Sequence, residues 1–248
     1  MNKKIKIYGE RNTNTNYISK LIQKNLYVDE ISGVVPEYID KIQKNMIGNE
    51  LLRDLYFYFT YEINLGWKHS CVRSLDEISK CRIMKDEILF LTITKNPYSW
   101  LLSLYRRPYH QYGKKKSSFE SFLESPWKTV ARDNCNRILE CPIELWNIKN
   151  RSYFNLKSLN CISITTESIF ANPEKIINEI SDIFFVKKKM NKFSNVSEST
   201  KENGKNFSFY RDYYLNEKWK EEISQSAISI INRSIDKNLM NQFGYEIL

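Results

Sequence analysis

A polar turn near the start of the chain carries side chains of the right kind to hold an anion. Residues 6–22 read KIYGERNTNTNYISKLI, an apolar segment followed by a polar turn and an amphipathic segment. A helix that starts after such a turn offers unpaired backbone N–H groups and the positive end of its dipole to a phosphate or sulfate. Thr13, Thr15 and Asn16 add side-chain donors, and Arg11 adds a permanent charge. We therefore expect an anion-binding loop, with an ordinary capped turn as the alternative.

This turn lacks the glycine-rich sequence of the loop that binds ATP. Its single glycine is Gly9, and no Gly-Lys-Ser/Thr ending follows it. A tight anion loop needs at least one residue with a positive φ, which glycine adopts most easily and asparagine next. Asn14 stands where this conformation is expected, so the missing glycine does not exclude such a loop.

The second candidate is a lysine directly after the apolar segment 87–94. Lys95 would lie at the carboxyl end of a parallel strand, which is the edge where α/β sheets bind ligands. Asn96 can cap the following helix and Pro97 can open it, with Ser103 further along. A lysine and a serine hydroxyl would suit a second phosphate, whereas the comparable strand of ATP and GTP enzymes often ends in an aspartate that helps to hold Mg²⁺. The alternative is a surface lysine beside a polar helix face.

Histidine is scarce, and one of the two histidines is our candidate for a general base. The number excludes a histidine-rich metal site. His69 ends the segment 63–69, INLGWKH, which we interpret as a strand, and an unperturbed histidine titrates near pH ~6.5. A lone histidine is more often structural than catalytic. Along a strand, Lys68 and His69 would point to opposite faces unless the strand ends or twists there.

The composition restricts the class of protein. The 248 residues are 42% hydrophobic and 14% aromatic, which is enough for a sizeable core in one domain over residues 1–248. The formal net charge of +9 suits an anionic ligand. Five cysteines without a CxxC pair indicate reduced thiols, and we expect no metal. No apolar run approaches the ~20 residues of a membrane span and the start of the chain lacks signal-peptide features, so we expect a cytoplasmic protein.

The candidate groups must be brought together by secondary structure. Four apolar, β-branched segments predict strands at 3–8, 63–69, 87–94 and 161–166. Helical patterns cover about 15–26, 37–60, 97–107, 118–125, 130–150, 173–185 and 217–242. This alternation predicts an α/β protein of three layers, α/β/α, with a central, mostly parallel sheet. The polar segment 192–212 reads as a long loop.

These stretches together resemble the sulfotransferases that use 3′-phosphoadenosine 5′-phosphosulfate (PAPS). That family has a strand–loop–helix of the form Lys-Ser-Gly-Thr-Thr, with which Asn-Thr-Asn-Thr-Asn at 12–16 aligns. A later strand of the family ends in Arg-Asn-Pro, with a serine eight residues after the arginine, and Lys95 and Ser103 have this spacing. Three further segments resemble parts of the family: 118–127, 164–180 and 235–248. The resemblance spans nearly the whole chain and has features similar to a bacterial or phage branch.

The resemblance implies a P-loop-NTPase-like sulfotransferase fold and transfer of a sulfuryl group from PAPS to a hydroxyl or amine without a metal. It also implies a histidine base, for which His69 is the counterpart in this chain. The residues implied for the donor site are Arg11, Asn12, Thr13, Asn14, Thr15 and Asn16 at the 5′ end and Lys95, Ser103, Lys201, Gly204 and Lys205 at the 3′ end.

Two departures from the family pattern concern its cations. Asn12 stands where the family has its loop lysine, and Arg11 is our first candidate to replace that charge, with Lys68 second. Lys95 stands where the family has an arginine, which keeps the charge but loses bidentate geometry. The predicted catalytic residues are therefore His69, Lys68 and Arg11.

Three other functions fit the same residues. One is a P-loop-type phosphotransferase that uses ATP and Mg²⁺, and another is a basic, non-enzymatic module that binds a nucleotide or polyanion. The third is a degenerate sulfotransferase that binds the nucleotide without transfer. For the sulfotransferase, the acceptor stays open among carbohydrates, lipids and small molecules, and we expect neither nucleic-acid binding nor a membrane span.

Overall fold

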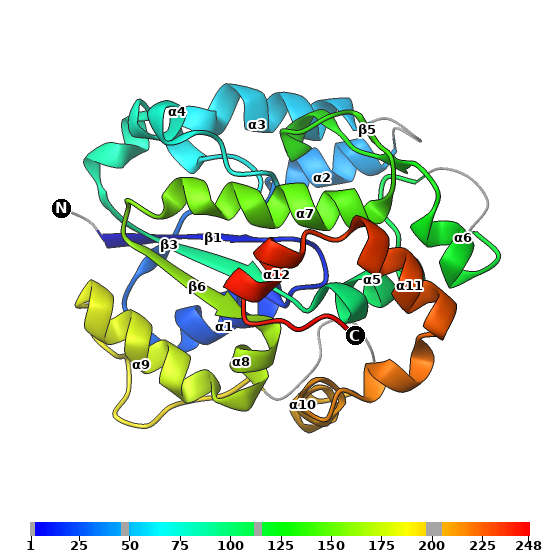
Figure 1. Cartoon of the computed structure of the whole chain (residues 1–248). Helices are drawn as coiled ribbons and strands as arrows, with labels where there is room; N and C mark the ends of the chain where they lie inside the picture. Colours follow the sequence, from blue (N-terminus) through cyan, green and yellow to red (C-terminus); the bar gives the residue numbers. More distant parts are fainter. Residues whose placement is uncertain (1–2, 46–49, 112–115, 197–204) are drawn as a thin grey trace.

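The computed structural model describes residues 3–45, 50–111, 116–196 and 205–248. At its centre lies a parallel sheet with the strand order β2–β1–β3–β6 (Figure 1). The strands are β1 (Lys3–Gly9), β2 (Asp29–Glu30), β3 (Glu87–Thr94) and β6 (Cys161–Thr165). Helices cover both faces of this sheet, so the predicted α/β/α architecture is confirmed, as are three of the four predicted strands.

The central strand β3 is buried on both sides, as its continuous apolar sequence predicts. Leu89, Leu91 and Ile93 pack in one cluster with α1 (Thr15–Asn25) and α9 (Pro173–Phe184). Ile88 and Phe90 point the other way, into a cluster that includes Leu65, Ile78 and Tyr153. Helices α3 (Leu51–Asn64), α4 (Leu75–Ser79) and α7 (Pro142–Ser152) lie on that second side of the sheet (Figure 1).

A third apolar cluster fills the region beyond the carboxyl edge of the sheet and includes Trp100, Trp127, Trp146 and Trp219. The helices here are α5 (Pro97–Arg106), α6 (Phe119–Leu123), α10 (Phe207–Leu215), α11 (Gln225–Ser234) and α12 (Lys237–Gln242). The remaining elements are α2 (Glu37–Lys44), α8 (Thr166–Ala171), the β4 (Trp127–Lys128) and β5 (Ile138–Leu139) pair, and the 3₁₀ turns η1 (Arg82–Lys85), η2 (Ala131–Asp133), η3 (Tyr153–Leu156) and η4 (Lys218–Glu222).

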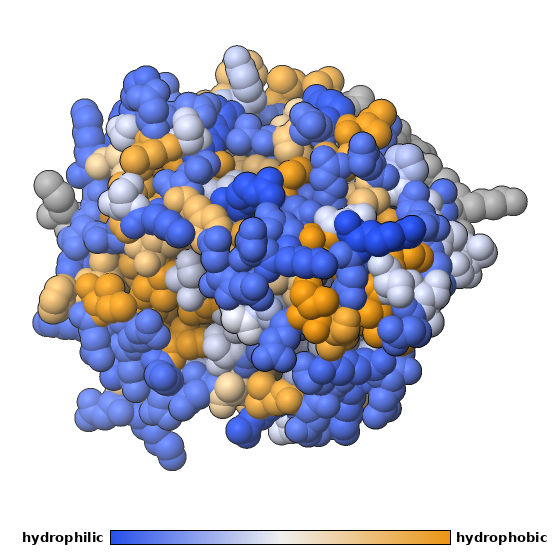
Figure 2. Space-filling model, in the orientation of Figure 1, coloured by the Kyte–Doolittle hydropathy of each residue, from blue (hydrophilic) through white to orange (hydrophobic). Residues whose placement is uncertain are grey.

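Hydrophilic residues cover much of the face seen in Figure 2, with hydrophobic residues gathered in separate groups. Within the described ranges, every helix is too short or too polar to cross a bilayer.

The predicted strand at 63–69 is wrong. Helix α3 continues to Asn64, and the chain then turns through two residues of positive φ, Leu65 at 58° and Gly66 at 79°. The carbonyl groups at this helix end accept hydrogen bonds from β1, because Lys6 Nζ donates to Asn64 O and Gly66 O at 2.6 Å each. The apolar residues Leu65 and Trp67 are therefore buried at a helix end and turn, not in a strand.

Other predicted boundaries also differ from the structure. The predicted helix 37–60 is two helices, α2 and α3, and the predicted helix 130–150 begins only at Pro142. The predicted helix 217–242 is divided among η4, α11 and α12, and the predicted loop 192–212 contains the start of α10 at Phe207. Residues 197–204 of that loop lie outside the described part of the chain.

The turn after β1 packs so closely on itself that only glycine fits at its start. A Cβ atom built on Gly9 would lie 2.8 Å from Thr13 Oγ1, 2.8 Å from Thr15 Cγ2 and 3.1 Å from Ile93 Cβ. These distances are shorter than ordinary van der Waals contacts. Gly9 is therefore required by close packing rather than by an unusual backbone angle.

We expect Gly9→Ala to lower the free energy of unfolding by about 1–3 kcal/mol, because the added methyl group overpacks this turn. Urea denaturation followed by circular dichroism measures the change. Lys20→Ala, on the exposed side of α1, is the control and should stay within about 0.5 kcal/mol of wild type. Equal stability of the two variants would contradict the close packing.

Candidate functional site

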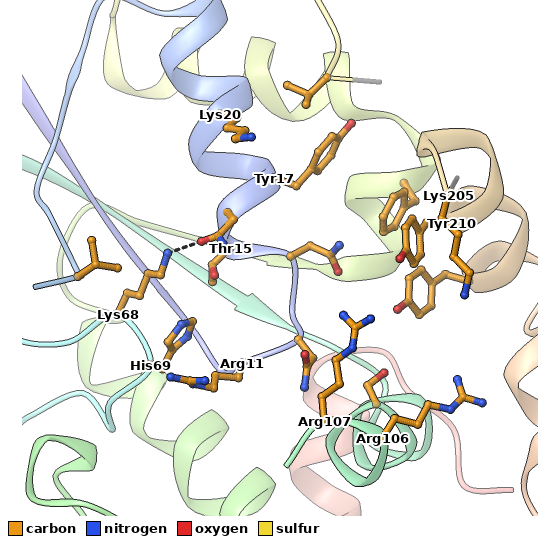
Figure 3. Close-up of a pocket in the computed structure, with 18 of the residues that line it drawn as sticks. Arg11, Thr15, Tyr17, Lys20, Lys68, His69, Arg106, Arg107, Lys205 and Tyr210 are labelled. Carbon is orange, nitrogen blue, oxygen red and sulfur yellow. Dashed lines mark hydrogen bonds between the residues drawn. The ribbon is translucent and has the colours of Figure 1, made fainter. Parts of the chain in front are cut away.

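A cavity of about 860 Å³ lies beyond the carboxyl ends of β1 and β3, where the β1–α1 turn meets the 67–69 turn, α5 and α10 (Figure 3). Its lining is strongly basic. The cationic side chains are Arg11, Lys20, Arg53, Lys68, Arg106, Arg107, Arg132 and Lys205, and the acidic ones are Asp40 and Glu222. The carboxyl edge of a parallel sheet is the usual ligand site of this architecture, so the cavity is the candidate functional site.

The β1–α1 turn has the backbone expected of an anion loop. Asn14 is the N-cap of α1 with a φ of 66°, so its predicted positive φ is confirmed. Asn12 has a φ of 69° as well, which the sequence analysis did not anticipate. Both side chains line the cavity, as do Thr15 and Asn16. The first N–H groups of α1 have no acceptor within the helix, because no earlier turn precedes them.

Thr13 differs from its neighbours in the turn. It is buried, and its backbone N–H and its Oγ1 donate to Glu10 O at 3.2 and 2.6 Å. Thr13 is not among the residues that line the cavity. Its hydroxyl therefore holds the turn in shape instead of presenting a donor to a ligand.

Arg11 carries a donor that the described residues leave unused. Its Nε is buried and has no hydrogen-bond partner among the described residues. The guanidinium carbon lies 4.6 Å from the centre of the Tyr109 ring and 5.5 Å from that of the Trp67 ring. Trp100 Nε1 donates to Arg11 O at 2.8 Å, which fixes the backbone. A buried, unpaired guanidinium donor is costly, and an anion in the cavity would satisfy it.

His69 lines the cavity in a defined tautomer. Its Nδ1 lies 2.5 Å from Gly9 O, and because a carbonyl oxygen only accepts, Nδ1 carries the proton. Nε2 then keeps its lone pair. Burial lowers the pKa of His69 well below 6.5, and the positive charges of Lys68 and Arg11 lower it further. The imidazole is therefore neutral at pH 7, the state that a proton acceptor needs.

Lys68 and His69 both line the cavity, although a strand would have pointed them to opposite faces. Both belong to the turn that replaces the expected strand, and Gly9 N–H donates to Lys68 O at 2.9 Å. Lys68 Nζ donates to Asn16 Oδ1 at 2.6 Å (Figure 3). Burial lowers the pKa of Lys68, and Arg11 nearby acts in the same direction.

The sequence analysis missed a buried lysine behind this site. Lys149 Nζ lies 2.9 Å from Glu10 Oε2 and 2.5 Å from Asp133 Oδ1, and it also donates to His69 O. All three charged side chains are almost fully buried. Burial alone would lower the pKa of Lys149, but Asp133 and Glu10 outweigh it and raise that pKa well above 10.5. The feature of the sequence that could have pointed to this buried ion cluster is Glu10, an acidic residue directly before Arg11 in the turn.

Lys95 lies beneath the cavity and not in its wall. It is fully buried, and its Nζ donates to Ser103 Oγ at 2.8 Å and to Tyr214 Oη at 3.0 Å. Ser103 and Tyr214 line the cavity, and Lys95 does not. Burial lowers the pKa of Lys95 to about 7, with Glu167 acting against the shift and Arg106 adding to it.

The wall near Ser103 holds three cations, of which only Lys205 was predicted from the sequence. Arg106, Arg107 and Lys205 line the cavity there (Figure 3). Arg106 pairs with Glu222 and donates to Tyr213 Oη at 3.2 Å. Beside them lies a group of stacked rings: Tyr17, Phe170, Phe207, Tyr210 and Tyr214. Of the three late-loop candidates only Lys205 is described, because Lys201 and Gly204 lie outside the described residues.

Comparison with known proteins identifies the fold. No family model matches the chain, and no curated protein does. Among solved structures, the chain is similar to a sulfotransferase domain from the Synechococcus PCC 7002 olefin synthase, with a TM-score of 0.51 and 12% sequence identity. The similarity covers 100% of this chain and 95% of that domain. The chain therefore has the P-loop-like fold of a sulfotransferase domain.

We expect Lys149→Met to lower the free energy of unfolding by about 3–5 kcal/mol, because it leaves the Glu10 and Asp133 carboxylates buried without a cation. Thermal and urea denaturation measure the loss. Lys175→Met is the control, since Lys175 is exposed on α9 and its removal should change stability by less than about 0.5 kcal/mol. Similar losses in both variants would show that Lys149 does not hold the site together.

Proposed function

We propose that the protein is a sulfotransferase that moves a sulfuryl group from PAPS to a hydroxyl or amine. The observation that carries the proposal is the buried, unpartnered Nε of Arg11, a residue of the β1–α1 turn that lines the same cavity as the neutral His69. This arrangement places an unsatisfied cationic donor, a helix start and a base on one cavity. The sulfotransferase-domain fold supports the same assignment.

We infer one orientation for the donor nucleotide in the cavity. The 5′-phosphosulfate would lie at the start of α1, on the N–H groups of Thr15 and Asn16 and on the guanidinium of Arg11. The 3′-phosphate would lie near Ser103 and Arg107, with Lys205 on the same wall. Thr13 and Lys95 would act from behind this wall, since neither lines the cavity.

The transfer would then proceed by one in-line displacement. His69 Nε2 would take the proton from the acceptor hydroxyl. The hydroxyl oxygen would bond to the sulfur of PAPS as the bond between that sulfur and the bridging phosphate oxygen breaks. Negative charge develops on the sulfuryl and leaving-phosphate oxygens. Arg11 and Lys68 would stabilise this charge, since both line the cavity beside His69.

An ATP-dependent phosphotransferase is the competing proposal, and the end of β3 argues against it. That strand ends at Thr94 and is followed by Lys95, whose ammonium is buried under Ser103. A metal-binding enzyme of this architecture often has a carboxylate at the comparable position. A binding protein without transfer activity would share the nucleotide site and differ only in turnover.

The test is calorimetric titration with 3′-phosphoadenosine 5′-phosphate, with ADP and ATP·Mg²⁺ as comparisons. We expect micromolar binding that needs the 3′-phosphate and does not need Mg²⁺. Arg11→Met should weaken binding by about tenfold or more, because a charge-assisted hydrogen bond to phosphate is lost. Lys175→Met removes an exposed charge on α9 and should have no effect. Tight binding of ATP·Mg²⁺ alone would overturn the proposal in favour of the phosphotransferase.

The pH dependence of this binding tests the position of Lys95. A phosphate beside Lys95 favours its ammonium form, so a lysine with a pKa of about 7 in the free protein must take up a proton on binding. Affinity of the wild type should therefore fall between pH 7 and 9, by up to about tenfold per pH unit. Lys95→Arg, which does not titrate in this range, should give a flatter profile. Identical slopes would show that Lys95 does not respond to the ligand.

A further inference from the structure

Two cysteines that are far apart in the chain lie together beside the buried ion cluster. All the cysteines are free thiols in the structure. Cys71 N–H donates to Asp133 O at 2.8 Å, and Asn134 Nδ2 donates to Cys71 O at 3.3 Å. These bonds join the segment that follows His69 to the segment that contains Cys135. The two thiols also form a side-chain hydrogen bond with each other.

The surroundings give the two thiols different properties. Cys71 is buried, whereas Cys135 is partly exposed in the irregular stretch between η2 and β5. The hydrogen bond with Cys71 lowers the pKa of Cys135, and the nearby Lys149 acts in the same direction. The same hydrogen bond, together with burial, raises the pKa of Cys71. Cys135 is therefore the more accessible thiol and the one more readily ionised, and Cys71 is its neighbour.

The other cysteines have different neighbours. Cys81 Sγ donates to a backbone oxygen of α4 at 3.3 Å, and Cys161 hydrogen-bonds to hydroxyl groups on β3 and β6. Cys141 is the N-cap of α7. Both Cys141 and Cys161 are partly exposed, as Cys135 is. Exposure alone therefore does not distinguish Cys135, but the adjacent thiol of Cys71 does.

We propose that Cys71 and Cys135 form a modification site, a dithiol that a peroxide converts reversibly to a disulfide, with an effect on the turn that carries His69. The Cys135 thiolate attacks a peroxide oxygen, so an S–O bond forms, the O–O bond breaks and the leaving oxygen takes up a proton. The Cys71 sulfur then bonds to the Cys135 sulfur, and the hydroxyl group leaves as water with the Cys71 proton. Both sulfurs are oxidised, and one hydrogen peroxide is reduced to two waters.

The disulfide would affect the site because each cysteine lies close to a residue that Lys149 binds. Lys149 Nζ donates to His69 O and to Asp133 Oδ1. His69 lies two positions before Cys71, and Asp133 stands in the same relation to Cys135. Bonded sulfurs are about 2 Å apart, which is closer than two hydrogen-bonded thiols. Disulfide formation must therefore draw one segment toward the other and move the groups held by Lys149.

The first test treats the full chain with hydrogen peroxide, alkylates the remaining thiols with iodoacetamide and identifies linked peptides by mass spectrometry. We expect a link between Cys71 and Cys135 that dithiothreitol reverses. Cys135→Ser should abolish the link, and Cys141→Ser, which is matched to it in exposure, should retain it. A link between any other pair would overturn the proposal. Oxidation of Cys135 to a sulfenic or higher acid, with Cys71 still open to alkylation, would also overturn it.

The second test follows the imidazole of His69 by NMR, with its signals assigned from a His69→Gln variant. We expect peroxide to shift the His69 ring signals in the wild type and in Cys141→Ser, and to leave them unchanged in Cys135→Ser. Unchanged signals in the fully oxidised wild type would overturn the proposed effect on the turn. Neither test uses PAPS or an acceptor, so both outcomes are independent of the proposed function.

Discussion

One buried ion cluster holds the candidate site in shape. Lys149 reaches from α7 through the core to Glu10 in the β1–α1 turn, to Asp133 in η2 and to the backbone oxygen of His69. Taking these charges out of water is costly, and that cost is recovered only if all of them are present in good geometry. The positions of Arg11 and His69 therefore depend on a side chain that never touches the cavity.

The same cluster sets the electrostatics of the cavity. Lys149 pairs with both Glu10 and Asp133 behind the cavity and offsets one of their two negative charges, while the positive charges of Arg11 and Lys68 lie in front. Those two charges then hold the pKa of the already buried His69 low and keep it neutral.

Sequence reasoning anticipated the local features and missed the long-range ones. The parallel sheet and its layers follow from apolar periodicity, and the positive φ of Asn14 follows from turn chemistry. The segment 63–69 was misread because a buried helix end with two turn residues has the same composition as a strand. The pairing of Lys149 with Glu10 joins positions 139 residues apart and has no local pattern. The withdrawal of Lys95 behind Ser103 and Tyr214 is likewise a tertiary effect.

We propose that the β1–α1 turn and the second half of α5, around Ser103, hold the two ends of one nucleotide. A crystal structure of the complex with 3′-phosphoadenosine 5′-phosphate tests this claim most directly. We expect the 5′-phosphate on the N–H groups of Thr15 and Asn16 with Arg11 Nε as a further donor, and the 3′-phosphate beside Ser103. A nucleotide bound in the reverse direction, or bound outside the cavity with Arg11 Nε still unpartnered, would contradict it.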